Sequence, residues 1–389
     1  SRSALLWSGA TERPIAFENN DRPGIMLAGA MRAYANRWAT AVSDRIAIFV
    51  NNDDAHRTAH DLHRLGVEIA AVIDSRPDAP TSDHFEVLPA SEVVNTHGRL
   101  GIKSIDVKTP QGLRQMQVSG LGVSGGWNPN IHLTCHQRGR PQWDPALSAF
   151  VPSADLPKSL LVAGAANGKM TTAAAMQDAV TMAMKIAKDL GHKPKSLKLP
   201  QTSDESVSVT PFWYVTGTQR GWVDQQNDVT VKDIKLAHQE NFRSVEHLKR
   251  YTTLGMATDQ GKTSNVLGLA IMAQTAGQSI PETGTTIYRP PYSPTAIGVF
   301  AGRSRDKDFR PVRKTPSHKW AEEQGAVFVE VGMWYRAQWF PQAGETHWRQ
   351  SVDREVKTTR ESVGICDVTT LGKIDVQGAD AAAFLNKIY

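Results

Sequence analysis

The chain has 389 residues, 40% of them hydrophobic and 21% charged, a composition typical of folded globular domains and not of disordered segments. Its length leaves room for two or three domains, and no apolar run reaches the roughly 18 to 20 residues of a membrane span. Only two cysteines occur, Cys135 and Cys366, which excludes a disulfide framework and a four-cysteine iron–sulfur cluster. We therefore expect a reducing, cytoplasmic setting, and we expect Cys366 to be a core thiol.

The net charge of +5 comes from one segment. Residues 303–319 carry seven Lys or Arg and two Asp, which accounts for the whole surplus. One basic stretch without an aromatic ladder does not make a nucleic-acid surface, so we predict neither a nucleic-acid nor a membrane partner. An acidic patch on a partner protein or an anionic substrate tail fits this segment better.

The first 200 residues alternate strand and helix signals. Residues 45–50 form a β-branched run, a helical pattern with Ala55, Ala59 and Leu62 follows, and residues 67–73 form a second apolar run. Strand, helix and strand within about 30 residues predict a βαβ unit. Residues 85–123 then predict an antiparallel meander with a turn at residues 109–112.

A further strand at residues 159–163 enters a glycine turn at residues 164–168. A long helix over residues 172–190 follows, with Gly191 at its end. A strand, a glycine turn and a helix N-terminus together form the arrangement that receives a pyrophosphate or the edge of a dinucleotide. The same glycines could instead serve only the packing of helix against strand, and the sequence leaves this alternative open.

The turn inside the first βαβ unit lacks the glycines of a dinucleotide fingerprint. Residues 51–54 read Asn-Asn-Asp-Asp, and two carboxylates would repel a diphosphate. We therefore interpret this lobe as a structural relic or a protein-contact module. His56, His60 and His63 follow on one helical stripe, where zinc binding is conceivable, but a solvated or interfacial face is commoner, so no metal is predicted.

Short helices dominate residues 230–280. Thr230 and Asp233 form a capping box, Ser244 caps a second helix that should end at Gly255, and a third helix starts near Ser264. Residues 288–294 predict a stiff, extended, proline-rich linker. Near the end we predict strands at 326–331 and 373–376, a helix near 345–360 and another from residue 381. The expected fold class is thus a combination of α/β and α+β domains.

These segments together resemble the alpha subunits of heterotetrameric sarcosine oxidase along nearly the whole chain. The matching stretches occur in the family's order: residues 13–17 with 20–26, 123–129, 162–168, 226–230, 247–256, 259–262 and 289–294. Residues 362–365, 371–378 and 380–382 resemble the start of a folate-binding domain of the glycine-cleavage T protein, or aminomethyltransferase, type.

The resemblance implies a domain plan for what we expect to be a segment of a longer polypeptide. Residues 1–204 would form part of an FAD/NAD(P)-type dinucleotide-binding domain, with a degenerate βαβ lobe inserted at about residues 40–125. Residues 205–285 would form a small helical module, residues 286–318 a linker, and residues 319–389 the start of the folate-binding domain.

The resemblance also implies an activity. The family oxidises sarcosine with O2 to glycine, hydrogen peroxide and a one-carbon unit, which tetrahydrofolate captures as 5,10-methylenetetrahydrofolate or which leaves as formaldehyde. FAD and a covalent FMN are held mainly by the beta subunit, and gamma and delta subunits complete the heterotetramer. The alpha subunit binds NAD, and Ala165, Met170 and Thr172 match the family's positions for it. No catalytic residue can be assigned, and the family's folate-binding residues fall beyond Tyr389.

Two residue changes refine the resemblance. Flavin-binding relatives carry Asp where this chain has Ala165, which argues against FAD in this lobe. The helical module resembles small iron–sulfur domains of amine and opine dehydrogenases, but Asp224, Gln226 and Asp259 replace their cysteines, so we predict no cluster. The alternative is a component of an amine, opine or cyanide-forming dehydrogenase with a purely scaffolding role.

Overall fold

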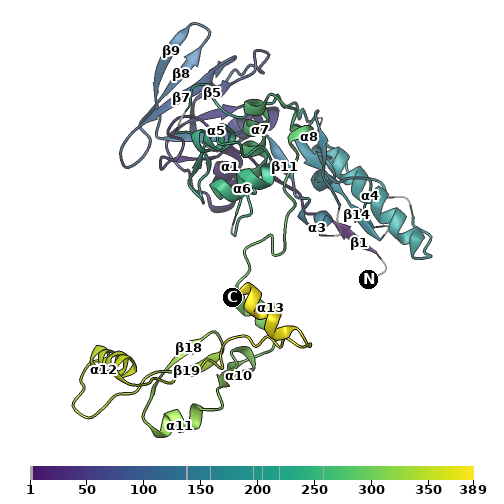
Figure 1. The fold of residues 1–389 in the computed structure, drawn as a ribbon. Helices are drawn as coiled ribbons and strands as arrows, with labels where there is room; N and C mark the ends of the chain where they lie inside the picture. Colours follow the sequence, from purple (N-terminus) through teal and green to yellow (C-terminus); the bar gives the residue numbers. More distant parts are fainter. Residues whose placement is uncertain are drawn as a thin grey trace. The chain divides into compact units, whose positions relative to one another are not determined.

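The computed structural model describes residues 3–136, 139–157, 159–195, 197–203, 205–218, 220–256 and 258–389. It divides into two compact units, residues 1–294 and 295–389 (Figure 1). Among the described residues, no helix combines the length and the apolar character needed to cross a membrane.

A five-stranded parallel sheet forms the centre of the first unit. Its strand order is β3-β10-β4-β5-β6, with bounds Ile25–Leu27, Gly120–Ser124, Arg45–Val50, Glu68–Asp74 and Val87–Leu88. Val50 lies opposite both Ser124 and Asp74, so β4, β5 and β10 end at one edge of the sheet. This edge is where the chain turns into its helices, and ligands of parallel sheets bind at such edges.

The two faces of this sheet carry different partners because side chains alternate along a strand. Helices α1 (Ala28–Trp38) and α2 (Asp53–Arg64) pack on the face of Ile46, Ile48 and Val50. The opposite face, with Ala47 and Phe49, packs against an antiparallel meander. The strands of this meander are β7 (Glu92–His97), β8 (Ser104–Thr109) and β9 (Gly112–Gln117).

The predicted βαβ unit and the turn at residues 109–112 are therefore confirmed, since β4 and β5 are parallel and α2 connects them. Ala55, Ala59 and Leu62 are the buried stripe of α2, as expected. The expectation that all of residues 85–123 form a meander is wrong at both ends. β6 and β10 join the parallel sheet instead: β10 is fully buried between β3 and β4, and β6 pairs with β5 at the sheet edge.

A second set of short strands leads to the glycine turn. β1 (Ala4–Leu6) pairs with β14 (Leu160–Val162), β2 (Ala10–Glu12) with β11 (Trp127–Pro129), and β12 (Gln142–Asp144) with β13 (Ala149–Val151). After β14 the chain forms the 3₁₀ helix η1 (Gly164–Asn167) and the long helix α4 (Thr172–Asp189). Gly191 follows α4 with φ of 84°, as the predicted helix end requires.

The helical module has its own apolar core. Its elements are α3 (His132–Cys135), β15 (Trp222–Asp224), β16 (Val229–Thr230), α5 (Val231–Gln239), α6 (Val245–Thr252), α7 (Asn265–Ala276) and α8 (Ile280–Thr283). The Thr230 capping box and the Ser244 cap are confirmed. Helix α6 ends earlier than predicted, because Thr253 already adopts a left-handed conformation with φ of 64°.

The second unit contains a small sheet of order β17-β19-β18, with bounds Arg313–Lys314, Trp334–Trp339 and Val327–Val331. Its helices are α9 (Ile297–Ala301), α10 (Asp306–Phe309), α11 (His318–Glu323), α12 (Trp348–Glu361) and α13 (Ala381–Ile388). The strand at 326–331 and both late helices are confirmed.

Two predictions for the second unit are wrong. Residues 373–376 form no strand, and Ile374 is 90% exposed, so their alternating pattern has no apolar surface to cover. Cys366 is exposed, not a core thiol, and the adjacent Ile365 is almost fully exposed as well.

Candidate functional site

A cavity of about 240 Å³ lies between the glycine turn and the Asn-Asn-Asp-Asp turn. The glycine turn contributes Ala165 and Met170, and the second turn contributes Asn52 with Asp54 and Arg57 of α2. The remaining wall comes from four other places in the chain: Ala10, Gly126 with Trp127, Leu147, and Val207 with Val209. Two of the three predicted NAD-contacting residues therefore lie at one cavity, and Thr172 does not line it.

The glycine turn is held by a carboxylate from its own helix. The Gly164 N–H donates to Asp178 Oδ2 at 3.0 Å, and Asn167 Nδ2 donates to the same oxygen at 3.1 Å. Gly164 has φ of 71°, and a Cβ there would lie 2.9 Å from Trp7 Nε1. Glycine is thus required for backbone geometry and packing, and this requirement holds whether or not a ligand binds.

The N-terminus of α4 also receives a carboxylate from the chain. The Thr172 N–H and hydroxyl donate to Glu205 at 2.6 and 3.0 Å, while the Thr171 hydroxyl caps the Ala174 N–H at 3.1 Å. The Thr172 N–H bond holds the pKa of Glu205 below its ordinary value, and Arg57 lies 3.6 Å from the same carboxylate. The position where the sequence predicted an anionic ligand thus holds an anionic side chain.

A short segment of chain closes the second turn. We call residues 206–210 the strap. The Asp53 N–H, at the start of α2, donates to the Ser208 carbonyl at 3.1 Å. Asn51 and Thr210 exchange two bonds, with Thr210 N to Asn51 O at 3.0 Å and Asn51 Nδ2 to Thr210 O at 2.7 Å. The strap therefore follows the carboxyl edge of β4 much as an added strand would.

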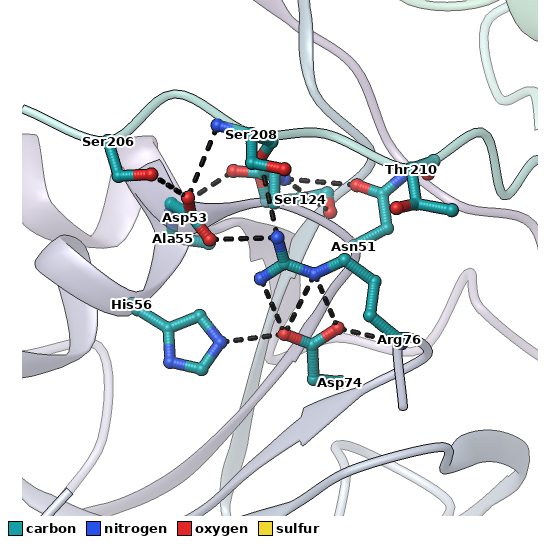
Figure 2. A network of polar contacts seen from close by, with 11 residues as sticks. Asn51, Asp53, Ala55, His56, Asp74, Arg76, Ser124, Ser206, Ser208 and Thr210 are labelled. Carbon is teal, nitrogen blue, oxygen red and sulfur yellow. Dashed lines mark hydrogen bonds and ion pairs between the residues drawn. The ribbon is translucent and has the colours of Figure 1, made fainter. Parts of the chain in front are cut away.

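Beneath the strap lies a buried network of charges (Figure 2). The Arg76 guanidinium lies between two carboxylates, 2.8 Å from Asp53 Oδ1 and 2.8 Å from Asp74 Oδ2. His56 Nε2 lies 2.7 Å from Asp74 Oδ2, and the Ser206 hydroxyl donates to Asp53. Arg76, Asp74 and His56 are all buried, so these groups satisfy one another away from water.

The network determines the protonation of both aspartates. Burial acts to raise the pKa of Asp74, but the hydrogen bonds from His56 and Arg76 outweigh it and hold the pKa below its ordinary value. Asp53 behaves in the same way, with Ser206 and Arg76 as the donors that outweigh burial. Both groups are therefore anionic at neutral pH, and Arg76 is their counter-ion.

This arrangement explains the missing fingerprint. A dinucleotide-binding lobe offers its first helix N-terminus to phosphates and an acidic residue after its second strand to a ribose. Here the Ser208 carbonyl of the strap accepts the Asp53 N–H, and the Asp74 carboxylate pairs with Arg76 and His56. The chain itself thus occupies the donors and acceptors that such a lobe would offer to a nucleotide, although Asn52 and Asp54 of the same turn still line the cavity.

The histidine stripe of α2 serves packing. His56 is the buried partner of Asp74, and His60 and His63 contact His84 and Phe85 through their rings. The described part of the chain contains no group of three or more His, Cys, Asp or Glu residues placed to hold a metal ion.

Sequence reasoning missed two buried charged residues behind the cavity. Glu12 accepts the Gly29 N–H at 2.7 Å, and burial, with a smaller contribution from the Asp54 charge, raises its pKa to about 7. Arg13 is fully buried and bonds the Gly125 carbonyl at 2.7 Å and Asn128 Oδ1 at 2.8 Å, and burial lowers its pKa to about 9. Arg13 occurs in a stretch that resembles the family, but no local pattern marks it as buried.

In the helical module, the buried Asp224 carboxylate is the centre of a set of hydrogen bonds from the surrounding loops. Its carboxylate accepts the N–H groups of Gln226 and Asn227 at 3.0 Å each and that of Gly255 at 2.7 Å. The Gln226 amide bonds Thr258 at 2.7 Å, and Asp259 accepts the Gly261 N–H at 2.7 Å. The Asp224 carboxylate thus accepts N–H groups that could otherwise bind a larger anion. The side-chain oxygens of Asp224, Gln226 and Asp259 are not the thiolate ligands that an iron–sulfur cluster needs.

Comparison with a solved structure defines the class of fold. The L-proline dehydrogenase from P. horikoshii superposes with a TM-score of 0.55 at 18% identity, covering 77% of this chain and 59% of that one. The two chains therefore share a fold, and the predicted multidomain α/β and α+β class is confirmed.

Two family models match in order: the Sarcosine oxidase A3 domain at residues 218–303 and the GCVT N-terminal domain at residues 317–389. The sarcosine oxidase alpha subunit of Rhizobium meliloti (strain 1021) is 44% identical over 99% of this chain and 40% of its own length. That of Corynebacterium sp. (strain P-1) is 39% identical over 100% of this chain and 42% of its own length. The chain therefore belongs to the family of sarcosine oxidase alpha subunits, as the resemblance predicted, and it spans about two fifths of their length.

A more distant relative bears on the alternative of a component of an amine or opine enzyme. One component of the opine oxidase of Rhizobium meliloti (strain 1021) is 20% identical over 77% of this chain and 76% of its own length.

Proposed function

We propose that this chain is part of the alpha subunit of a sarcosine oxidase complex with beta, gamma and delta partners. The complex oxidises sarcosine with O2 to glycine, hydrogen peroxide and a one-carbon unit carried by tetrahydrofolate. The observation that supports this most is the 44% identity along 99% of the chain, with an A3 domain followed by a GCVT domain.

In this proposal the first unit binds NAD at the cavity of about 240 Å³. Small-molecule pockets usually measure about 300–1,000 Å³, so the cavity fits one part of a dinucleotide. Ala165 leaves room beside the glycine turn, Met170 offers an apolar contact, and Arg57, which pairs with Asp54 at 2.6 Å, is the cation of the lining. The N–H of Thr172 becomes available to a phosphate only when Glu205 moves away.

The FAD and the covalent FMN belong mainly to the beta subunit in this proposal, and tetrahydrofolate belongs to the GCVT-type domain that begins in the second unit. The chain contributes scaffold, nucleotide binding and one-carbon transfer, while the flavins supply the redox chemistry. The presence of Ala165 in place of a ribityl-binding aspartate supports the absence of flavin from this lobe.

A component of an opine oxidase or a related dehydrogenase is the second candidate, supported by the coverage of 77% of this chain and 76% of the opine oxidase chain. Its much lower identity of 20% and the absence of thiolates at Asp224, Gln226 and Asp259 favour the first candidate.

The decisive experiment uses the purified complex. We expect sarcosine-dependent oxygen consumption, release of NAD on denaturation, and no stoichiometric iron by elemental analysis. Met170→Asp is expected to reduce the NAD content, because a carboxylate would face the cofactor, whereas Ala183→Asp on the exposed face of α4 is a matched control. Oxidation of an opine but not of sarcosine would contradict the proposed activity. Unchanged NAD content in Met170→Asp would contradict the proposed NAD site.

A further inference from the structure

A groove of about 650 Å³ lies in the helical module, between α6 and the chain near residue 289. It shares no lining residue with the cavity between the two turns. Its volume falls within the range of about 300–1,000 Å³ that holds small organic molecules.

The groove carries unbalanced positive charge. Lys249, Arg250 and Arg289 line it, and Glu246 is the one acidic residue of its lining. Arg250 pairs with Glu246, whereas Lys249 and Arg289 have no carboxylate within ion-pair distance among the residues that the structure describes. Burial lowers the pKa of Lys249, and the charges of Arg289 and Arg250 act in the same direction, while the Glu246 charge opposes them in part. Because like charges are brought together here, an anion in the groove would be stabilising.

The backbone of Arg289 is fixed in place. Gln260 Nε2 donates to the Arg289 carbonyl at 2.6 Å, and the Arg289 N–H donates to Gln260 Oε1 at 3.0 Å. Lys262 Nζ holds the same stretch of chain through the Tyr292 carbonyl at 2.9 Å. A cation on a backbone already held in position loses less entropy when it binds a ligand.

Apolar side chains line the same groove. Met256 is 39% exposed and Ile287 is 41% exposed. A ligand that fits this groove therefore combines an anionic group for the two free cations with an apolar body for these side chains.

We propose that this groove binds a small organic anion, with a carboxylate or phosphate group held by Lys249 and Arg289 and an apolar body against Met256 and Ile287. An acidic segment of a partner protein fits less well, because the Glu246 carboxylate at the groove would repel an extended run of acidic residues. The proposal does not depend on NAD binding, since no residue of that cavity takes part.

Calorimetric titration of the purified protein with phenyl phosphate at low ionic strength tests the proposal. We expect saturable binding, weakened about tenfold or more in Lys249→Gln and in Arg289→Gln, because each removes a charge-assisted hydrogen bond. Lys232→Gln, on an exposed face of α5, should bind as the unaltered protein does. Ile287→Ser should weaken phenyl phosphate about threefold and leave inorganic phosphate unaffected, since it removes only apolar contact.

Three outcomes would overturn the proposal. The first is the absence of binding by both phenyl phosphate and benzoate. The second is binding that survives unchanged in both charge variants while circular dichroism shows them folded. The third is a polyglutamate peptide that binds through Lys249 and Arg289 more tightly than phenyl phosphate, which would assign the groove to an acidic protein segment.

Discussion

The two nucleotide-type turns of the first unit differ in what fills them. At residues 164–168 the turn faces a cavity, and only single carboxylates, from Asp178 and Glu205, occupy its donors. At residues 51–54 a continuous strap and a buried ion network occupy most of the edge, although Asn52 and Asp54 still line the same cavity. A binding site filled by one side chain can be reopened by a rotamer change, whereas one filled by backbone pairing is part of the fold.

The largest expected effect tests the filled turn. Arg76→Met leaves Asp53 and Asp74 buried without their counter-ion, so we expect a loss of about 3–5 kcal/mol in the free energy of unfolding. Arg114→Met, which removes an exposed pair with Glu86, should cost less than about 1 kcal/mol. Urea unfolding of both variants measures the difference, and equal losses would show that the network is not essential to the fold.

The same network predicts a dependence on acid. The folded-state pKa values of Asp53 and Asp74 lie below the ordinary value of 3.8, so their stabilisation is present above that pH and is lost as the pH falls through the folded values. In Arg76→Met the loss on acidification should be smaller, because both aspartates lose a donor that holds their folded-state pKa low. Unfolding midpoints from about pH 6 to about pH 2 compare the two proteins, and parallel curves would contradict this assignment.

Glu12, whose carboxylate accepts the Gly29 N–H in the first turn of α1, gives a smaller effect of opposite sign. Its folded pKa of about 7 exceeds the ordinary 4.5, so the stability it contributes is complete below about pH 4.5 and declines as the pH rises to about 7. Glu12→Gln should match the unaltered protein near pH 4 and exceed its stability by roughly 3 kcal/mol near pH 8. Thermal unfolding at both pH values measures this, and a variant less stable at the higher pH would show that the anion is needed.

The smallest effect concerns Glu205. Glu205→Gln weakens the interaction with the α4 N-terminus and should cost about 0.3–1 kcal/mol of stability. If NAD binds as proposed, the same change should raise its affinity, because the competing carboxylate is gone. Glu361→Gln, at the C-terminal end of the exposed helix α12, serves as the control in both measurements.

The sequence allowed prediction of features whose cause is local. The turn at residues 164–168, the capping box at Thr230 and the stripe of α2 each depend on residues a few positions apart. The strap could not be predicted, because Ser208 bonds Asp53 across 155 positions and residues 206–210 carry no distinctive pattern. The prediction of a strand at 373–376 was wrong for a related reason. An alternating pattern does not show whether a distant partner strand is present.

The strap has a consequence for how the protein is made. The lobe that contains β4 and β5 is translated long before residues 206–210, and ribosomes add about 5–20 residues per second. After β10 is made, the lobe therefore waits for roughly 4–16 seconds with the amide of Asp53 and the charges of Arg76 and Asp74 uncovered. The early part of the chain reaches its final form only once a later part has left the ribosome, so a truncation before residue 206 should yield a nascent lobe prone to capture by chaperones.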